Sequence, residues 1–158
     1  MAEGVALITD GALHTDFPVK NMDKKRVYTA RMPIRWGDMD AMGHVNNTVY
    51  FRYFEQARIE WLDKLGFGPD GHGEGPVIIN AHCTFLRQLK FPGDIEVWTY
   101  VGLIGRSSIE TVHEIRRADD PSVIWAQGGA KVVWVNYAQE KSVALSDALR
   151  QRLIEAVD

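Results

Sequence analysis

One long amphipathic segment, residues 48–65, constrains the fold of this chain more than any other part of the sequence. Its apolar residues recur at steps of four, three, four and four, the spacing of one helical face: Tyr50, Phe54, Ala57, Trp61 and Leu65. Gly66 follows as a helix-ending residue. A broad aromatic stripe of this kind is most simply core, so the segment is predicted to be a helix that covers one face of a sheet.

Strand-like runs flank this helix on both sides. One run, residues 26–36, precedes it, and four runs follow it over residues 77–86, 95–104, 107–117 and 123–137. In the first run the apolar residues alternate as in a half-buried strand: Tyr28, Ala30, Met32, Ile34 and Trp36. Pro33 cannot donate to a strand ladder, which predicts an edge position or a bulge.

The later runs carry similar signals. The second run places alternate residues on one predicted apolar face: Val77, Ile79, Ala81, Cys83 and Phe85. Gly128 and Gly129 would permit a bend or bulge in the last run. A short closing helix is predicted over residues 146–157, with Ser146 as its N-cap.

The order of one strand, one long helix and four closely connected strands predicts an α+β fold. An antiparallel sheet would wrap around the helix. Residues 1–24 show no clear periodicity and are interpreted as an N-terminal arm, and residues 25–158 as a single domain. The length of 158 residues suits one domain with a real core.

Charge and composition exclude several classes of partner. The formal net charge is −3, so no basic surface predicts nucleic-acid binding. Cys83 is the only cysteine, which favours a reducing compartment and excludes an intramolecular disulfide. No apolar run approaches the roughly 20 residues that span a bilayer, and the start lacks the pattern of a secretory signal. We therefore expect a cytoplasmic protein with no membrane partner.

Most of the functional information lies in residues 35–58, where a strand leads through an acidic, glycine-containing turn into the long helix. Asp and Gly between a strand and a helix are ordinary turn chemistry. The same arrangement also places the Asp40 carboxylate beside the free backbone N–H groups of a helix N-terminus. Those groups could polarise a substrate carbonyl oxygen. Spacing alone leaves both interpretations open.

The order Asp-x-Asp-x-x-Gly-His-x-Asn-Asn from Asp38 to Asn47, with Tyr50 three residues further on, narrows the choice. It resembles the signature of hotdog-fold acyl-CoA thioesterases of the 4-hydroxybenzoyl-CoA thioesterase type. The resemblance implies a hotdog domain, an acyl-CoA substrate, no cofactor, and Asp40 as the catalytic carboxylate. It also implies a homo-oligomer, either a dimer or a dimer of dimers, which is consistent with the open edges of the predicted sheet.

Thioester hydrolysis requires a nucleophile or an activated water, together with donors to the oxyanion. Asp40 could attack the thioester directly or take a proton from water, and both routes remain open. The expected oxyanion donors are the backbone amides of Thr48 and Val49. His44 is either a loop histidine or a residue that orients water or Asp40. Asn47 could cap the helix or bind substrate, and capping is the simpler role.

Asp38 is expected to orient the turn, and the binding residues are assigned more loosely. Candidates for the acyl pocket, by their proximity to Asp40 in the sequence, are Trp36, Met42, Tyr50 and Phe54. Candidates for the phosphates of coenzyme A, in two loops that resemble those of the family, are Arg87, Lys90 and Arg106. For any one of these three, a solvated surface charge is the simpler explanation.

Other functions remain to be weighed against thioester hydrolysis. A hydratase or dehydratase on the same fold would need a His and a carboxylate together, for which His44 and Glu55 are the available pair. An acyl carrier protein substrate and a non-catalytic acyl-CoA-binding module are further alternatives. Cys83, His82 and His113 are expected to be structural, and no metal site is expected. The identity of the acyl group is not indicated by the sequence.

Overall fold

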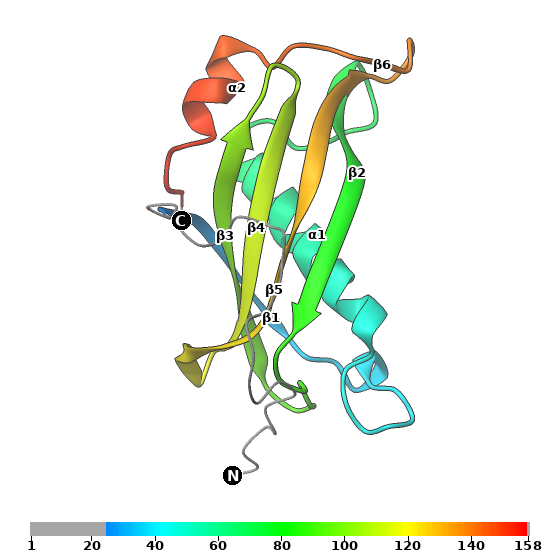
Figure 1. The fold of residues 1–158 in the computed structure, drawn as a ribbon, viewed down its shortest axis with the longest axis vertical. Coiled ribbons are helices and arrows are strands. Elements are labelled where there is room, and N and C mark those ends of the chain that lie inside the picture. Colours follow the sequence, from blue (N-terminus) through cyan, green and yellow to red (C-terminus); the bar gives the residue numbers. More distant parts are fainter. Residues whose placement is uncertain (1–24, 158) are drawn as a thin grey trace.

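The structure, a computed structural model, describes residues 25–157, so the predicted arm over residues 1–24 lies outside the described residues. One antiparallel sheet of six strands packs with one face against the long helix α1 (Asn47–Lys64) (Figure 1). Its strands are β1 (Arg26–Pro33), β2 (Glu74–Phe85), β3 (Asp94–Ile104), β4 (Ser108–Arg117), β5 (Asp120–Asn136) and β6 (Lys141–Ser142). Two short helical elements complete the described chain: η1 (Trp36–Asp38) and α2 (Asp147–Arg152).

The strand order is β1-β3-β4-β5-β2, with β6 added to β5. All pairings between these strands are antiparallel. Strands β1 and β2 therefore form the two edges of the sheet, and α1 crosses behind β3, β4, β5 and β2 in Figure 1. The predicted α+β hotdog fold is confirmed, and Pro33 lies on an edge strand as expected.

Helix α1 begins and ends within one residue of its predicted limits. The side chain of Asn46 caps its start, and Leu65 ends it before Gly66, whose φ of +82° suits a residue without a side chain. The predicted apolar face is confirmed, since all five of its residues are buried: Tyr50, Phe54, Ala57, Trp61 and Leu65. The closing helix has the predicted Ser146 cap but is shorter, ending at Arg152.

The prediction for the end of the first strand is wrong. Strand β1 stops at Pro33, and the chain then turns through η1 instead of continuing to Trp36. The turn is held by Asp38, whose carboxylate accepts the backbone N–H of Arg35 at 2.9 Å. Trp36 is consequently 77% exposed and does not join the core.

The predicted apolar face of the second run is wrong over its first half. A register shift lies between Ile78 and Asn80 in β2, so the alternation of sides changes there. Val77 and Ile79 are exposed, whereas Cys83 and Phe85 pack against the core. The exposed apolar residues of β2, Val77, Ile78 and Ile79, therefore lie on a free edge of the sheet.

The glycine pair in β5 serves close packing. Gly128 and Gly129 pair in continuous register with Cys83 and His82, so no bulge lies at this point of the ladder. A Cβ atom on Gly128 would collide with the backbone carbonyl oxygen of His82 on β2 and would lie 2.8 Å from the ring of Phe54. Because Gly128 has no side chain, α1 can approach β5 closely at Phe54.

Candidate functional site

The acidic turn before α1 is a tight loop closed by its own backbone. Met39 and Val45 form an isolated antiparallel bridge, and the Asp40 N–H donates to the His44 carbonyl at 3.0 Å. The Gly43 N–H donates back to the Asp40 carbonyl at 3.0 Å, with Gly43 at a φ of +81°. Because side chains rarely adopt that φ, glycine is the residue that suits this loop. The loop turns Asp40 back toward the start of the helix.

The carboxylate of Asp40 is oriented by two donors. Oδ1 accepts the backbone N–H of Met42 at 2.9 Å, and Oδ2 accepts the side-chain amide of Asn46 at 3.4 Å. Asp40 is only partly buried. Its carboxylate is therefore held in one direction while it remains accessible from outside.

Asn46, and not Asn47, caps the helix. Its side-chain oxygen accepts the backbone N–H of Thr48 at 2.9 Å and the Thr48 hydroxyl at 2.7 Å. Its carbonyl accepts the N–H of Val49 at 3.0 Å. The amides of Thr48 and Val49, expected as oxyanion donors, are thus already occupied. Within residues 25–157 the Asn47 N–H has no acceptor, which makes it the available donor of this turn.

Asp40 and the start of the helix share one cavity of about 120 Å³. Its lining combines the acidic turn, the helix N-terminus and the end of β2 with the loop that follows: Asp40, Met42, His44, Val45, Asn47, Tyr50, Phe85, Arg87 and Gln88. Six of the predicted site residues therefore come together: Asp40, Met42, His44, Asn47, Tyr50 and Arg87.

Tyr50 forms the buried wall of this cavity. Its hydroxyl oxygen accepts the backbone N–H of Leu89 at 3.3 Å, and its ring meets Phe85 edge-on with centroids 4.8 Å apart. Burial is the main cause that raises the pKa of Tyr50 to about 12, and the nearby Cys83 and Asp40 raise it further. The phenol therefore keeps its proton at neutral pH.

Two of the four acyl-pocket candidates lie elsewhere. Trp36 is exposed and does not line the cavity, because the strand that was expected to carry it ends earlier. Phe54 is 1% exposed and stacks on His113 with ring centroids 5.1 Å apart, so it belongs to the core. Met42 lines the cavity at its exposed rim, and Tyr50 at its buried wall.

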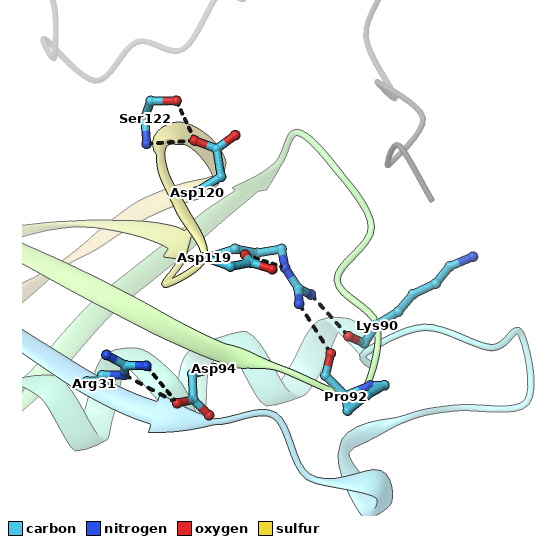
Figure 2. Close-up of polar contacts among 8 residues, drawn as sticks. Arg31, Lys90, Pro92, Asp94, Asp119, Asp120 and Ser122 are labelled. Carbon is cyan, nitrogen blue, oxygen red and sulfur yellow. Dashed lines mark hydrogen bonds and ion pairs between the residues drawn. The ribbon is translucent and has the colours of Figure 1, made fainter. Parts of the chain in front are cut away.

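The three basic candidates are separated. Arg87 lines the cavity, in the segment that follows β2. The Lys90 carbonyl accepts a hydrogen bond from Arg117 at 3.3 Å, while its exposed side chain extends away from that contact (Figure 2). Arg106 lies in the β3–β4 turn, where its carbonyl accepts the Leu145 N–H at 2.9 Å. Within one chain this turn lies at the other end of the sheet from the Asp40 loop.

The loop of Lys90 is fixed to the sheet from two sides. Arg117 donates to the Lys90 carbonyl and, at 3.2 Å, to that of Pro92. Arg31 on β1 pairs with Asp94 at 3.1 Å just beyond this turn (Figure 2). These contacts hold the base of the loop that carries Arg87 to the cavity and Leu89 to Tyr50.

Asp38 has a supporting position under the acidic turn. Its buried carboxylate accepts the Tyr53 hydroxyl at 2.7 Å and the Arg35 N–H at 2.9 Å. Burial and the bond to Asp38 raise the pKa of Tyr53 far above its ordinary value. These contacts agree with the expected role of Asp38 in orienting the turn. The partnership with Tyr53 was not expected, since Tyr53 lies off the predicted apolar stripe.

Cys83, His82 and His113 lie partly or fully inside the fold. Burial raises the pKa of the Cys83 thiol to about 12. His113 is fully buried between Thr99, 3.1 Å from Nδ1, and Arg58, 3.5 Å from Nε2. Burial, and then the Arg58 charge, hold the pKa of His113 well below its ordinary range. Burial also lowers the pKa of His82. The pairing of Arg58 with His113 was not foreseen.

Within residues 25–157 no three His, Cys, Asp or Glu side chains gather in a group that could hold a metal ion. Over the same residues, no helix combines the length and apolar character needed to cross a bilayer. Asp38 and Asp40, the two carboxylates of the acidic turn, have separate hydrogen-bond partners.

Several proteins of known structure share the architecture of this chain. The PA2801 protein of Pseudomonas aeruginosa, described as a proposed thioesterase, is 39% identical, with a TM-score of 0.78 over 80% of this chain and 98% of that one. A proposed acyl-CoA thioesterase of Xanthomonas campestris is 36% identical, with a TM-score of 0.63 over 70% and 93% of the two chains. The 1,4-dihydroxy-2-naphthoyl-CoA thioesterase Slr0204 of Synechocystis shares the fold at 14% identity, with a TM-score of 0.73 over 80% and 94%.

A family model also matches the chain directly. The model describes the thioesterase-like superfamily and covers residues 34–153, which include the acidic turn, helix α1 and every strand after it. With the hotdog architecture already established, this match shows that the chain belongs to the thioesterase-like superfamily of hotdog-fold thioester hydrolases.

Proposed function

We propose that this chain hydrolyses acyl-CoA thioesters to a free acid and coenzyme A, with Asp40 as the reacting carboxylate. The observation that carries the proposal is the shared cavity: Asp40 and the free N–H of Asn47 line the same small space. The Asp40 carboxylate can act on the carbonyl carbon or on water, and the Asn47 N–H can donate a hydrogen bond to the carbonyl oxygen. Thioester hydrolysis requires this combination of groups.

The Asn47 amide is the proposed oxyanion donor, in place of the amides of Thr48 and Val49. It lies in the first turn of an 18-residue helix, where the aligned peptide dipoles favour negative charge. A thioester carbonyl oxygen placed there gains negative charge as the tetrahedral intermediate forms. Since the donor is already in place before the reaction, it need not reorganise to stabilise that charge.

Asp40 acts by one of two routes. As a nucleophile it forms a bond from its oxygen to the carbonyl carbon while the carbon–sulfur bond breaks, giving a mixed anhydride and the thiolate of coenzyme A. Water then hydrolyses the anhydride. As a general base it accepts a proton from the water that attacks the same carbon. His44 lines the cavity and is placed to orient that water or Asp40.

The second enzyme class gains no support from the geometry. A hydratase would need His44 and Glu55 together, but Glu55 pairs with Arg52 at 3.3 Å on the exposed side of α1. Glu55 lines a different groove, between α1 and the β1 edge, together with Arg35 and Tyr53. The hydrolase proposal therefore explains more of the cavity.

The proposed assembly is a homodimer joined along the β2 edges. This edge exposes Val77 at 39%, Ile78 at 40% and Ile79 at 60%, and a free strand edge with apolar side chains favours pairing with a second copy. An antiparallel two-fold pairing brings opposite ends of the two sheets together. It would move Arg106 of the partner subunit toward this subunit's cavity, where Arg87 already lies. That arrangement would let both residues contact the phosphates of coenzyme A.

The test is a hydrolysis screen across acyl-CoA thioesters of different chain length and ring content, with Asp40→Asn measured alongside. Asparagine keeps the shape of the side chain but removes the anionic nucleophile or base. We expect kcat to fall at least about a hundredfold, the lower end for losing general acid–base assistance. Circular dichroism should show an intact fold. Activity of Asp40→Asn within a few-fold of the unmodified protein would remove Asp40 from the mechanism.

A further inference from the structure

The sheet has a second face, turned away from α1, which the described elements leave without a cover. Within residues 25–157, the extensive contacts of helices with the sheet are those of α1 with β1, β2 and β3, on the opposite face. The face without a cover is turned toward the viewer in Figure 1, with α1 behind it, and is called the outer face below. Its centre consists of strand residues that alternate with core positions of β3, β4 and β5: Trp98, Tyr100, Val112, Glu114, Gln127 and Gly129.

The centre of the outer face is less exposed than the solvated face of a sheet. Side chains on the water-facing side of an antiparallel sheet are typically polar and exposed. Here Tyr100 is 8% and Glu114 is 7% exposed, and Val112, which pairs with Tyr100 in the register of β3 and β4, is partly buried. The Tyr100 hydroxyl donates to Glu114 Oε2 at 3.1 Å, so the buried carboxylate has a partner. Buried aromatic, aliphatic and charged side chains on one face are typical of a face that another segment covers.

The described chain begins at this face. Strand β1 starts at Arg26, which lies opposite Tyr100 in the register of β1 and β3. The Arg26 guanidinium stacks over the Trp98 ring at 4.1 Å, so its side chain lies on the outer face. Residues 1–24 therefore join the domain at the edge of this face. A segment of that length can extend over roughly 80 Å, and adjacent strands lie about 4.8 Å apart, so it is long enough to cross the whole sheet.

The sequence of residues 1–24 suits the outer face in apolar content and in charge. Large apolar side chains recur along it: Val5, Leu7, Ile8, Leu13, Phe17, Val19 and Met22. It also carries four acidic side chains against two basic ones. On the outer face, Arg26 and Lys131 form no ion pair with a carboxylate of residues 25–157. The excess of carboxylates in residues 1–24 therefore complements these two cations.

Residues 1–24 lie outside the part of the chain that matches the family. The family model begins at residue 34, and 98% of the PA2801 protein is matched by 80% of this chain. A role for this segment is therefore particular to this chain and separate from the shared hydrolase domain. A second copy suits the outer face less well, because it would bring two further unpaired cations, its own Arg26 and Lys131, to the same place.

We propose that residues 1–24 dock on the outer face of the sheet and cover Tyr100, Val112 and Glu114. The inference goes beyond the proposed hydrolysis and does not depend on it. A face covered in this way cannot stack on the same face of a second copy. The β2 edge then remains as the surface through which two copies associate.

The test is photo-cross-linking in the full chain, with p-benzoylphenylalanine placed at one position at a time. Gln127 lies on the outer face opposite Glu114 and does not line the Asp40 cavity. When Gln127→p-benzoylphenylalanine is irradiated and digested with trypsin, the main cross-linked product should contain the peptide that ends at Lys20. Gln56→p-benzoylphenylalanine is the matched control, because Gln56 is exposed on α1, on the other side of the sheet. It should not give this product.

A second measurement uses the unmodified protein and needs no variant to fold. Trypsin should cleave the full chain after Lys20 at least about tenfold more slowly than it cleaves a synthetic peptide of residues 13–30, because it cuts only the undocked fraction of the segment.

Three results would overturn the inference. The first is cleavage after Lys20 at the same rate in the full chain and in the peptide. The second is a Gln127→p-benzoylphenylalanine protein whose product lacks the peptide that ends at Lys20, including one in which the outer face of a second copy is cross-linked instead. The third is a Gln56→p-benzoylphenylalanine protein that cross-links that peptide to the same extent. The proposed function fails separately, if Asp40→Asn retains its hydrolytic activity.

Discussion

Replacing Tyr53 by Phe tests whether the acidic turn is anchored from below. Tyr53 is 1% exposed, and its hydroxyl donates to the buried Asp38 carboxylate at 2.7 Å. A hydrogen bond to a charged group contributes about 1.5–3 kcal/mol. Asp38 keeps the Arg35 backbone N–H at 2.9 Å, so the loss should lie near the lower part of that range, about 2 kcal/mol. In a chain of this length that corresponds to a melting temperature about 4–8 °C lower.

The assay is urea and thermal unfolding at one fixed protein concentration, because self-association would make stability depend on concentration. Tyr137→Phe is the control. Its hydroxyl donates to the neutral carbonyl of Pro76 at 3.2 Å, and removing it should cost only about 1 kcal/mol. A double-mutant cycle with Asp38→Asn isolates the Tyr53 pair. The reasoning is refuted if Tyr53→Phe costs no more than Tyr137→Phe, or if the cycle shows no coupling.

Three further outcomes follow from the packing and the titrating groups. Gly128→Ala should lower the free energy of unfolding by about 3 kcal/mol or more, since its Cβ would collide with the backbone carbonyl oxygen of His82 and lie 2.8 Å from Phe54. Gly37→Ala, with open space around it, should be nearly neutral in the same urea titration. The pKa values of Tyr28, Tyr50 and Tyr100 are raised to about 12, so the contribution of their neutral forms to the free energy of unfolding is complete below pH 10. Urea unfolding measured at a series of pH values should show this free energy falling from pH 10 to pH 12. The lowered pKa of His113 acts in the opposite direction, because the contribution of its neutral imidazole to the free energy of unfolding is complete above pH 6.5. This free energy should fall as the pH drops from 6.5 to about 5, and His113→Gln should reduce that loss.

The sequence predicted well what depends on short stretches of chain. The helix boundaries came within one residue because the apolar spacing, the Asn pair and Gly66 all lie inside or next to the helix. The same holds for the acidic turn, where Gly43 at a φ of +81° closes a loop of a few residues around Asp40. Local hydrogen bonds set these features, and local residues reveal them.

The wrong predictions lie where the alternation of apolar residues in a strand is interrupted by a side-chain hydrogen bond or by a register shift, neither of which the alternation itself reveals. Trp36 continues the alternation of β1 but is turned outward, because Asp38 binds the Arg35 N–H and starts a new turn. In β2 a register shift falls inside the predicted run, and Val77 and Ile79 on its predicted core face are exposed, as is Ile78 on the other face. Because a register shift interrupts the alternation of sides, a face extrapolated across it from the sequence is wrong for part of the strand.

Contacts between distant residues were beyond any pattern in the sequence. Arg58 and His113 lie 55 residues apart, and each occupies a place that suits an apolar residue. The burial of both is explained only by their contact, with Thr99 on the other side of the imidazole. The Arg58 guanidinium is always a donor, so the His113 Nε2 that faces it must be the acceptor, and Nδ1 then carries the proton toward Thr99.

The cavity is formed partly by local contacts within the acidic turn and partly by contacts with a loop that is distant in the sequence. The two parts can therefore change independently of each other. The groups proposed for the reaction, Asp40 and the Asn47 amide, lie seven residues apart in one continuous turn. The buried wall of the cavity depends instead on the approach of a distant loop, since Leu89 reaches Tyr50 across 39 residues. A change in the length or sequence of the loop after β2 would move Leu89 and Arg87 without altering the turn around Asp40. Chains with the same acidic turn could therefore keep the chemistry and differ in the acyl group, so this loop, rather than the turn, is where substrate preference should be sought.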